Sequence, residues 1–233
     1  MRSILAALLV IVPAAAWAQS CPAPLAAASR LVLVTADTLS SNTATLRRYV
    51  RPSPRSAWVA DGGATTALIG RNGMAWGYLF RDLARPGEPI KTEGDKRAPI
   101  GFYRIGASFG FMPSARPDYL RIRADSVCVD DPASPAYNTI TSRARVGAKV
   151  RGENMARVPD YRHGLLVDYA SNRAARGGSC IFIHLWMPNK TGTGGCVALP
   201  ERQLVALQNF AERGAVLAIM PRQALERFKG CLP

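Results

Sequence analysis

Residues 178–197 read GSCIFIHLWMPNKTGTGGCV, an apolar run followed by a loop rich in glycine. The continuous apolar run over residues 180–185 is typical of a buried strand. His184 stands near the end of this run, and two glycines come directly before Cys196. Because glycine lets the backbone turn sharply, the stretch predicts a buried strand that ends with His184 and a tight turn that presents Cys196.

Strand-like segments extend outward from this stretch in both directions. β-Branched and apolar residues predict further strands at residues 30–36, 45–50, 56–60, 102–105, 164–169 and 215–220. Asn72-Gly73 is a turn signal, and it predicts a hairpin that joins residues 65–69 to residues 75–79.

Helix signals are few and come late in the chain. From Pro200 onward, apolar residues recur at helical spacing and predict a helix that ends at Gly214. A last short helix is expected over residues 221–228. Residues 113–142 are rich in Pro, Asp, Ser and Asn and predict mostly loop. Many strands with few helices predict a mainly β fold of the α+β class in a single domain.

Residues 1–18 have the features of a secretory signal peptide. Arg2 supplies a positive charge, and residues 4–12 form an apolar run too short to span a bilayer. Residues 16–18 (AWA) match a small-x-small cleavage site, so we expect cleavage before Gln19. A retained anchor helix is the alternative. We therefore expect residues 19–233 to form an exported domain in the periplasm or cell wall, without stable membrane insertion.

The chain is strongly basic, with a formal net charge of +14, which loss of Arg2 lowers to +13. A field of this sign attracts polyanions such as cell-wall polymer, anionic lipid or nucleic acid. The basic residues are scattered and lack the interleaved aromatic residues on which bases stack. This pattern argues against a nucleic-acid partner.

The cysteines indicate an oxidising compartment, where disulfides form. The chain has five of them, so at least one thiol is left over. Cys21 and Cys231 lie near the two ends of the chain, and the termini of a domain are often close together. Pairing them, and pairing Cys128 with Cys180, would leave Cys196 free. The sequence alone does not settle this connectivity.

Cys196 and His184 have the residue types that nucleophilic catalysis requires. Such catalysis needs a thiolate, a nearby base and backbone N–H donors for the oxyanion. We expect His184 to act as the base and to lower the thiol pKa from about 8.5 toward neutrality. The backbone around Gly194 and Gly195 would supply the N–H donors.

Other interpretations of the same residues stay open. Cys196 could be a small core residue or half of a disulfide, and His184 a hydrogen-bonded core residue. Cys180, His184 and Cys196 are also acceptable zinc ligands, although paired Cys-x-x-Cys spacing and a fourth ligand are missing. His163 directly precedes a predicted buried strand and is interpreted as structural. The sequence contains no Gly-x-Ser-x-Gly, P-loop or His-Glu-x-x-His motif, and we expect no metal and no organic cofactor.

The stretch resembles the catalytic motif of L,D-transpeptidases with a YkuD-type domain. That motif runs from a histidine at a strand end, over a short loop, to Ser/Thr-His-Gly-Cys and an aliphatic residue. Here it reads His184, loop, then TGGCV at residues 193–197. Further segments resemble the family at residues 91–95 (KTEGD), 99–110 (PIGFYRIGASFG), 128–138 (CVDDPASPAYN) and 164–169 (GLLVDY). The resemblance covers roughly residues 30–220.

The resemblance implies a YkuD-type fold and a peptidoglycan substrate. Cys196 would attack a stem-peptide carbonyl, form a thioester and pass the acyl group to an amine of a neighbouring stem. The cross-link would join two diaminopimelates, or L-alanine at position 1 to diaminopimelate. Alternatives are a carboxypeptidase or hydrolase, in which water takes the acyl group, and a non-catalytic wall-binding protein. Carbapenem-type β-lactams would be inhibitors. Substrate contacts are expected from Trp186, Thr193, Tyr137 and Asn138.

Two positions depart from the family pattern. The histidine usually found two residues before the cysteine is Gly194 here, and the arginine or asparagine after the aliphatic residue is replaced by Ala198-Leu199. These departures leave the nucleophile and base in place but change the surroundings of the substrate. The net positive charge suits an anionic stem peptide.

Overall fold

The computed structural model describes residues 21–212 and 214–233. The predicted signal peptide and its cleavage site before Gln19 therefore lie outside the described residues. No helix in the described part of the chain is long and apolar enough to cross a membrane.

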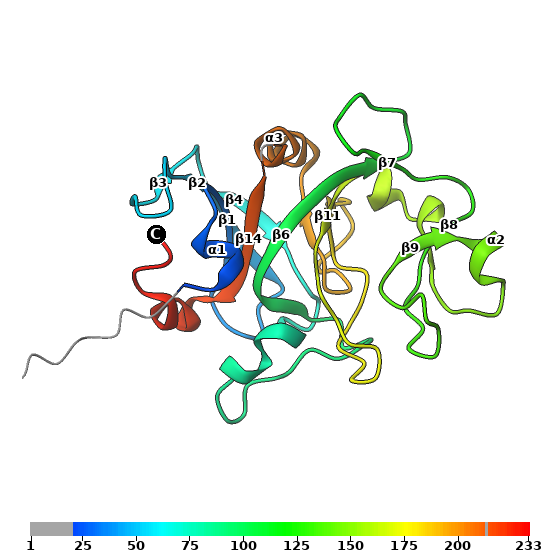
Figure 1. Cartoon of the computed structure of the whole chain (residues 1–233), viewed down its shortest axis with the longest axis horizontal. Coiled ribbons are helices and arrows are strands. Elements are labelled where there is room, and N and C mark those ends of the chain that lie inside the picture. The colour runs from blue at the N-terminus through cyan, green and yellow to red at the C-terminus, as the bar shows by residue number, and fades with distance from the viewer. Residues whose placement is uncertain (1–20, 213) are drawn as a thin grey trace, which may run out of the picture.

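The described chain is built around one large sheet that closes on itself (Figure 1). Its strand order is β1-β14-β6-β11-β12-β13-β4-β2-β3, and a second pairing between β1 and β2 closes it. Within the described residues it has eleven strands: β1 (Arg30–Ala36), β2 (Thr43–Val50), β3 (Val59–Ala60), β4 (Thr65–Leu68), β5 (Met74–Trp76), β6 (Ala98–Gly110), β7 (Leu120–Arg121), β11 (His163–Val167), β12 (Phe182–Leu185), β13 (Val197–Leu199) and β14 (Ala215–Pro221). The structure thus confirms a mostly β single domain with few helices.

The middle of the sheet is apolar because its strands are covered on both faces. Every residue of β14 is buried, and this strand runs parallel to β1 and antiparallel to β6. Strands buried on both faces are expected to be continuous apolar runs. The sequences RLVLVTA of β1 and AVLAIMP of β14 have this character.

One long helix covers part of the sheet. α3 (Glu201–Ala211) lies against β6, β11 and β12 (Figure 1). Its Leu204, Leu207 and Phe210 pack into the same core cluster as the sheet residues. The buried Gln208 amide donates a hydrogen bond to the carbonyl of Gly164 in β11, over 3.1 Å. The remaining helical segments are short: α1 (Ala23–Ala26), η1 (Tyr78–Leu83), α2 (Arg143–Val146), η2 (Met155–Arg157), η3 (Pro159–Arg162) and η4 (Arg222–Phe228), where η marks a 3₁₀ helix.

The predicted hairpin around Asn72-Gly73 is wrong. A turn does form there, since the Gly73 N–H donates to the carbonyl of Gly70 over 2.8 Å. However, β4 pairs with β2 and β13, whereas β5 pairs in parallel with the start of β6. Residues 78–79, expected at the end of the hairpin, begin η1 instead. Long-range partners on both sides of the turn therefore override the local hairpin signal.

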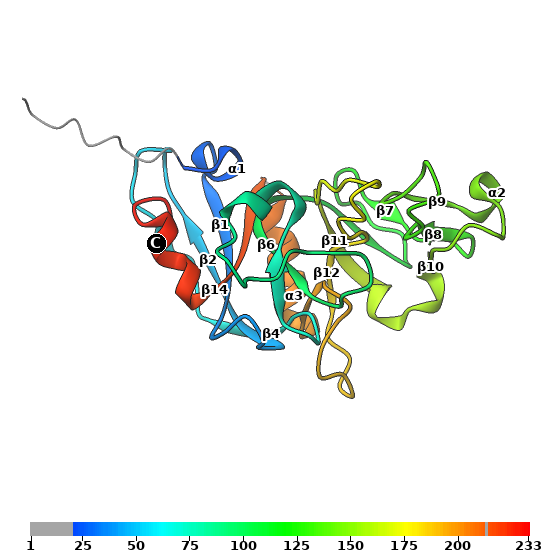
Figure 2. The ribbon, with the colours of Figure 1, turned by 90° about the horizontal axis from the view of Figure 1, so that it is seen from below.

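A small three-stranded sheet stands at one end of the molecule, beyond β11 (Figures 1 and 2). Its strands are β8 (Ser126–Cys128), β9 (Ile140–Ser142) and β10 (Glu153–Asn154). The disulfide between Cys128 and Cys180 joins it to the segment that leads into β12. This link matters for the site, because Glu153 of the small sheet and His184 of β12 line the same cleft.

The other disulfide joins Cys21 to Cys231 and so connects the two ends of the described chain. Both pairings considered from the sequence are thus present. Cys196 is the free cysteine of the described residues, and it is buried. Two disulfides are compatible with an extracellular protein.

Candidate active site

Cys196 and His184 line one cleft of about 280 Å³. Their placement follows from the pairing of β12 with β13, which are parallel neighbours: Ile183 is aligned with Val197 and His184 with Ala198. Cys196 directly precedes β13 and therefore lies beside Phe182, the first residue of β12. The predicted buried strand thus carries both the histidine and the backbone that holds the cysteine.

The Cys196 sulfur is held by the backbone of the segment that leads into β12. The Phe182 N–H donates to Sγ over 3.3 Å, and the thiol in turn donates to the carbonyl of Cys180 over 3.5 Å. The residue is 6% exposed. Burial raises the pKa of the Cys196 thiol to about 12, because a charged sulfur would be poorly solvated there.

The His184 ring is oriented by its own strand end. Nδ1–H donates to the carbonyl of Leu185 over 2.8 Å, which leaves Nε2 of the neutral ring as a proton acceptor. Asp160 Oδ2 lies 3.9 Å from Nδ1, and Lys190 donates to the same oxygen over 2.7 Å. Burial lowers the pKa of His184 below its usual value, although the Leu185 hydrogen bond and the Asp160 charge oppose this shift.

These pKa shifts correct the expectation that His184 lowers the thiol pKa toward neutrality. Burial favours the neutral form of both groups. The resting cleft is therefore lined by a neutral thiol and a neutral imidazole. Such a pair acts by removing the thiol proton as the sulfur attacks, which is general-base catalysis.

The turn before Cys196 is fixed by Thr193. Its hydroxyl donates to the Cys196 carbonyl over 2.7 Å and accepts the Gly195 N–H over 3.0 Å. The Gly195 N–H, expected to bind the oxyanion, is therefore engaged within the turn. Among the residues that the structure describes, the N–H groups of Gly194 and Cys196 have no hydrogen-bond partner. These two donors remain for an oxyanion.

The two glycines of the turn have different structural roles. Gly195 has φ +137°, and a Cβ there would come within 2.8 Å of the Arg97 carbonyl oxygen. Only glycine fits this position without strain. Gly194 lines the cleft, and a Cβ there would meet nothing within 4 Å. The family's histidine at this position would therefore project into open space.

Of the residues expected to contact substrate, the structure places one in the lining of the cleft and three outside it. Thr193 lines the cleft, whereas Trp186, Tyr137 and Asn138 are not among its lining residues. Trp186 Nε1 donates to the Lys190 carbonyl over 3.1 Å and so closes the loop after β12. Tyr137 donates its hydroxyl proton to Glu93, which does line the cleft.

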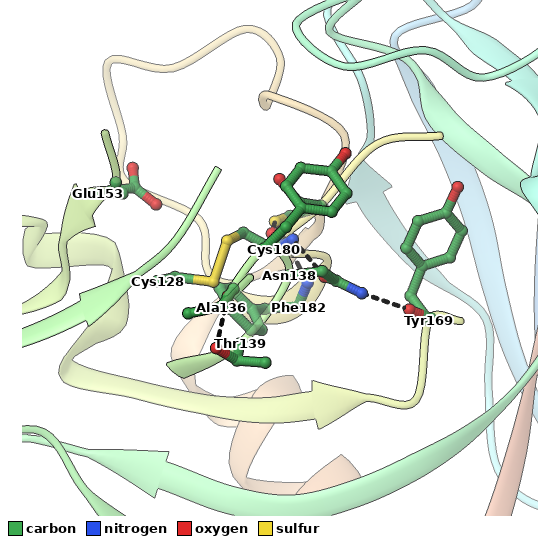
Figure 3. The surroundings of a disulfide bond; sticks show 12 residues. Cys128, Ala136, Asn138, Thr139, Glu153, Tyr169, Cys180 and Phe182 are labelled. Atoms are coloured by element: carbon green, nitrogen blue, oxygen red, sulfur yellow. Dashed lines mark hydrogen bonds between the residues drawn. A yellow bond between two sulfur atoms is a disulfide. The ribbon is translucent and has the colours of Figure 1, made fainter. Parts of the chain in front are cut away.

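Asn138 holds the backbone of Cys180, the residue that forms the disulfide with Cys128 (Figure 3). Its Oδ1 accepts the N–H of Cys180 over 3.0 Å, and its Nδ2 donates to the Tyr169 carbonyl over 2.8 Å. Cys180 has φ +56°, an unfavourable conformation for a residue with a side chain. Asn138 and the disulfide to Cys128 both hold Cys180 in it, and the Cys180 carbonyl in turn accepts a hydrogen bond from the Cys196 thiol.

The sequence interpretation missed the acidic residues of the cleft. Four carboxylates line it: Glu93, Asp130, Glu153 and Asp160. Glu93 lies in the KTEGD segment and could have been selected from the family resemblance. Asp130 likewise lies in a segment that resembles the family, residues 128–138, whereas no local pattern marks Glu153 of β10 or Asp160 of η3. Burial raises the pKa values of Asp130 and Glu153, and the neighbouring charges of Glu93 on Asp130 and of Asp130 on Glu153 add to the rise.

The zinc interpretation loses one of its ligands. The Cys180 sulfur is bonded to Cys128, so it is not free to bind a metal beside His184 and Cys196.

Comparisons of the chain with protein-family models, curated proteins and solved structures give no match. The resemblance to a family of transpeptidases therefore rests on the sequence motifs alone.

Proposed function

We propose that the chain is a peptidoglycan L,D-transpeptidase, an exported cysteine acyltransferase with a YkuD-type fold. The observation that carries the proposal is the shared cleft of Cys196 and His184, in which Nδ1 of the histidine is committed to Leu185 and Nε2 is left as the base. The motif segments support it, because they meet in space. Glu93 of the KTEGD segment and Thr193 of the TGGCV segment line the same cleft.

The reaction begins with removal of the thiol proton. His184 Nε2 takes the proton from Cys196 while Sγ attacks a stem-peptide carbonyl carbon. The N–H groups of Gly194 and Cys196 bind the resulting oxyanion. As the tetrahedral intermediate collapses, the C–N bond breaks, and the leaving amine takes the proton from the imidazolium. A thioester on Cys196 remains.

An acceptor amine then resolves the thioester. Its nitrogen attacks the carbonyl and gives a proton to His184, and the Cys196 sulfur leaves and is reprotonated by the histidine. The result is a new amide bond between two stems and a restored thiol. If water attacks instead, the same site is an L,D-carboxypeptidase. Gly194 lines the cleft where the family has a histidine, so we keep both cross-links as candidates: diaminopimelate to diaminopimelate, and L-alanine to diaminopimelate.

Single and double variants of the pair test the proposal. Cys196→Ala and His184→Ala should each abolish nearly all turnover of a disaccharide-peptide donor, and the double variant should be little worse than either, because the two residues act as one unit. His163→Ala is the control and should retain activity, since His163 contacts Glu201 on the surface. After incubation with a carbapenem, the intact mass of the wild type should increase by the mass of the drug, and the intact masses of the variants should not change. Additive losses in the double variant would contradict the pairing.

A further inference from the structure

The cleft of Cys196 is acidic although the chain is basic. Its four carboxylates face two cationic lining residues, Arg71 and Lys190. Lys190 is already bound to Asp160 over 2.7 Å. The chain as a whole has a net charge of +14. The negative charge is thus concentrated where the substrate would enter.

Neutral donors hold two of these carboxylates in place without cancelling their charge. The Ser179 hydroxyl donates to Glu93 over 2.6 Å, and the Tyr161 hydroxyl donates to Glu153 over 2.6 Å. Within residues 21–212 and 214–233, no salt bridge is formed by Glu93, Asp130 or Glu153. Mutual repulsion between fixed carboxylates favours binding of a cation from outside.

Asp160 supplies an independent sign that the cleft binds a hydrogen-bond donor. It is 3% exposed and lines the cleft, and its Oδ1 has no hydrogen-bond partner. A buried oxygen without a partner costs roughly 1–3 kcal/mol, unless a bound group donates to it. A donor entering the cleft would remove this cost.

We infer that the acidic wall of the cleft, formed by Glu93, Asp130, Glu153 and Asp160, binds the primary ammonium group of the acceptor peptide. A primary ammonium is compact and carries three donors, which suits several converging carboxylates better than a planar guanidinium does. The wall orients the acceptor beside the thioester on Cys196, and the bound ammonium gives one proton to a solvent water before its nitrogen attacks. This inference rests on the proposed function and names the acceptor as a peptide with a free primary amine.

Binding to a protein that cannot turn over tests the subsite directly. Two synthetic stem-type peptides are used that are identical except that the side-chain amine is free in one and acetylated in the other. Calorimetry with the Cys196→Ala protein should give at least about tenfold tighter binding of the free amine, which corresponds to about 1.4 kcal/mol. In a Cys196→Ala protein that also carries Asp130→Asn and Glu153→Gln, the two peptides should bind equally.

The matched control carries Asp125→Asn and Glu226→Gln, which remove the same charge at exposed positions outside the cleft. It should keep the preference for the free amine. If the protein with both wall substitutions does not fold, Asp130→Asn alone is used. This variant should fold, because Asp130 accepts no side-chain hydrogen bond among the described residues, and it should reduce the preference for the free amine.

The outcomes of this test are separable from those of the proposed reaction. Equal binding of the two peptides to the Cys196→Ala protein, or no binding of either, would overturn the subsite whether or not the wild type forms cross-links. Preference for the free amine that the wall substitutions remove and the control retains supports the subsite, even if the wild type proves to be a hydrolase.

Discussion

At the scale of single residues, the chemistry starts from two neutral groups. The Cys196 thiol has a pKa raised to about 12 by burial, and His184 has a pKa lowered by burial. Above its pKa His184 is neutral and can accept a proton, and below it the ring is charged and inactive as a base. The rate of acylation should therefore follow His184 rather than the thiol.

The pH dependence of acylation tests this order of events. The rate should fall as the pH drops through a value below 6.5, about tenfold per unit at the acid end, and should stay flat between about pH 7 and 9. Stopped-flow measurement of acylation by a carbapenem across pH 4–10 gives the profile. A rate that instead rises with an apparent pKa near 8.5 would mean that a preformed thiolate reacts.

The two glycines of the turn give a matched pair of variants. Gly195→Ala places a side chain at φ +137° and 2.8 Å from the Arg97 carbonyl oxygen, so it should lower the free energy of unfolding by about 2 kcal/mol or more. Gly194→Ala meets nothing within 4 Å and should change it by less than about 0.5 kcal/mol. Chemical denaturation of both variants measures the difference. Equal losses would show that the turn is not built as described.

At the scale of elements, the position of Cys196 depends on the segment that connects the small sheet to β12. The Cys128–Cys180 disulfide and Asn138 hold the backbone that contacts Cys196 Sγ. Cys128→Ala with Cys180→Ala should lower the acylation rate at saturating donor about tenfold or more, since small misplacements of a nucleophile are costly.

The second disulfide provides the control for that variant. Cys21→Ala with Cys231→Ala opens a loop of 210 residues and should cost up to about 5 kcal/mol of stability. Its acylation rate at 25 °C should stay within about twofold of the wild type, because this disulfide lies outside the cleft lining. Equal rate losses in both double variants would mean that the Cys128–Cys180 link acts only through stability.

The sequence predicts those strands and helices that can be recognised from their own apolar pattern, without knowledge of the strands with which they pair. The apolar runs of β1, β12 and β14 and the helical spacing of α3 are visible because burial alone determines them. The hairpin at Asn72-Gly73 fails because β5 pairs with β6, which lies more than twenty residues further along the chain. β6 is likewise far longer than the strand predicted over residues 102–105, since it pairs successively with β5, β14 and β11.

The residues of the candidate site likewise fall into two groups: those that the sequence identifies and those that only the fold brings to the cleft. His184, Cys196 and the Thr193 turn lie within one stretch, and their residue types and spacing identify them. Asp160 and Glu153 reach the cleft only through η3 and the small sheet, so no local pattern marks them. The raised thiol pKa is a property of the folded surroundings and is equally invisible in the sequence.

At the scale of the whole molecule, the positive net charge of the chain and the negative charge of the cleft produce electrostatic fields of opposite sign, which act over different distances. The net charge of +14 favours anionic polymers in general, whereas the carboxylates of the acidic wall line the cleft. Exposed charges are screened over about 8 Å at physiological salt. Binding of the Cys196→Ala protein to isolated cell-wall sacculi should therefore weaken about tenfold or more between 50 and 500 mM salt, as measured by co-sedimentation. Binding that does not change with salt would mean that charge does not drive capture.

The central claim is that Cys196 transfers an acyl group between stem peptides, and mass spectrometry of the muropeptide products tests it most directly. The purified protein is incubated with disaccharide-peptide donors, with and without an added amino acid. Wild type should yield cross-linked dimers, or products in which the leaving amino acid is exchanged for the added one, and Cys196→Ala should yield neither. Formation of these products by the Cys196→Ala protein would contradict the account, and so would a wild type that acylates Cys196 but releases only hydrolysed stems.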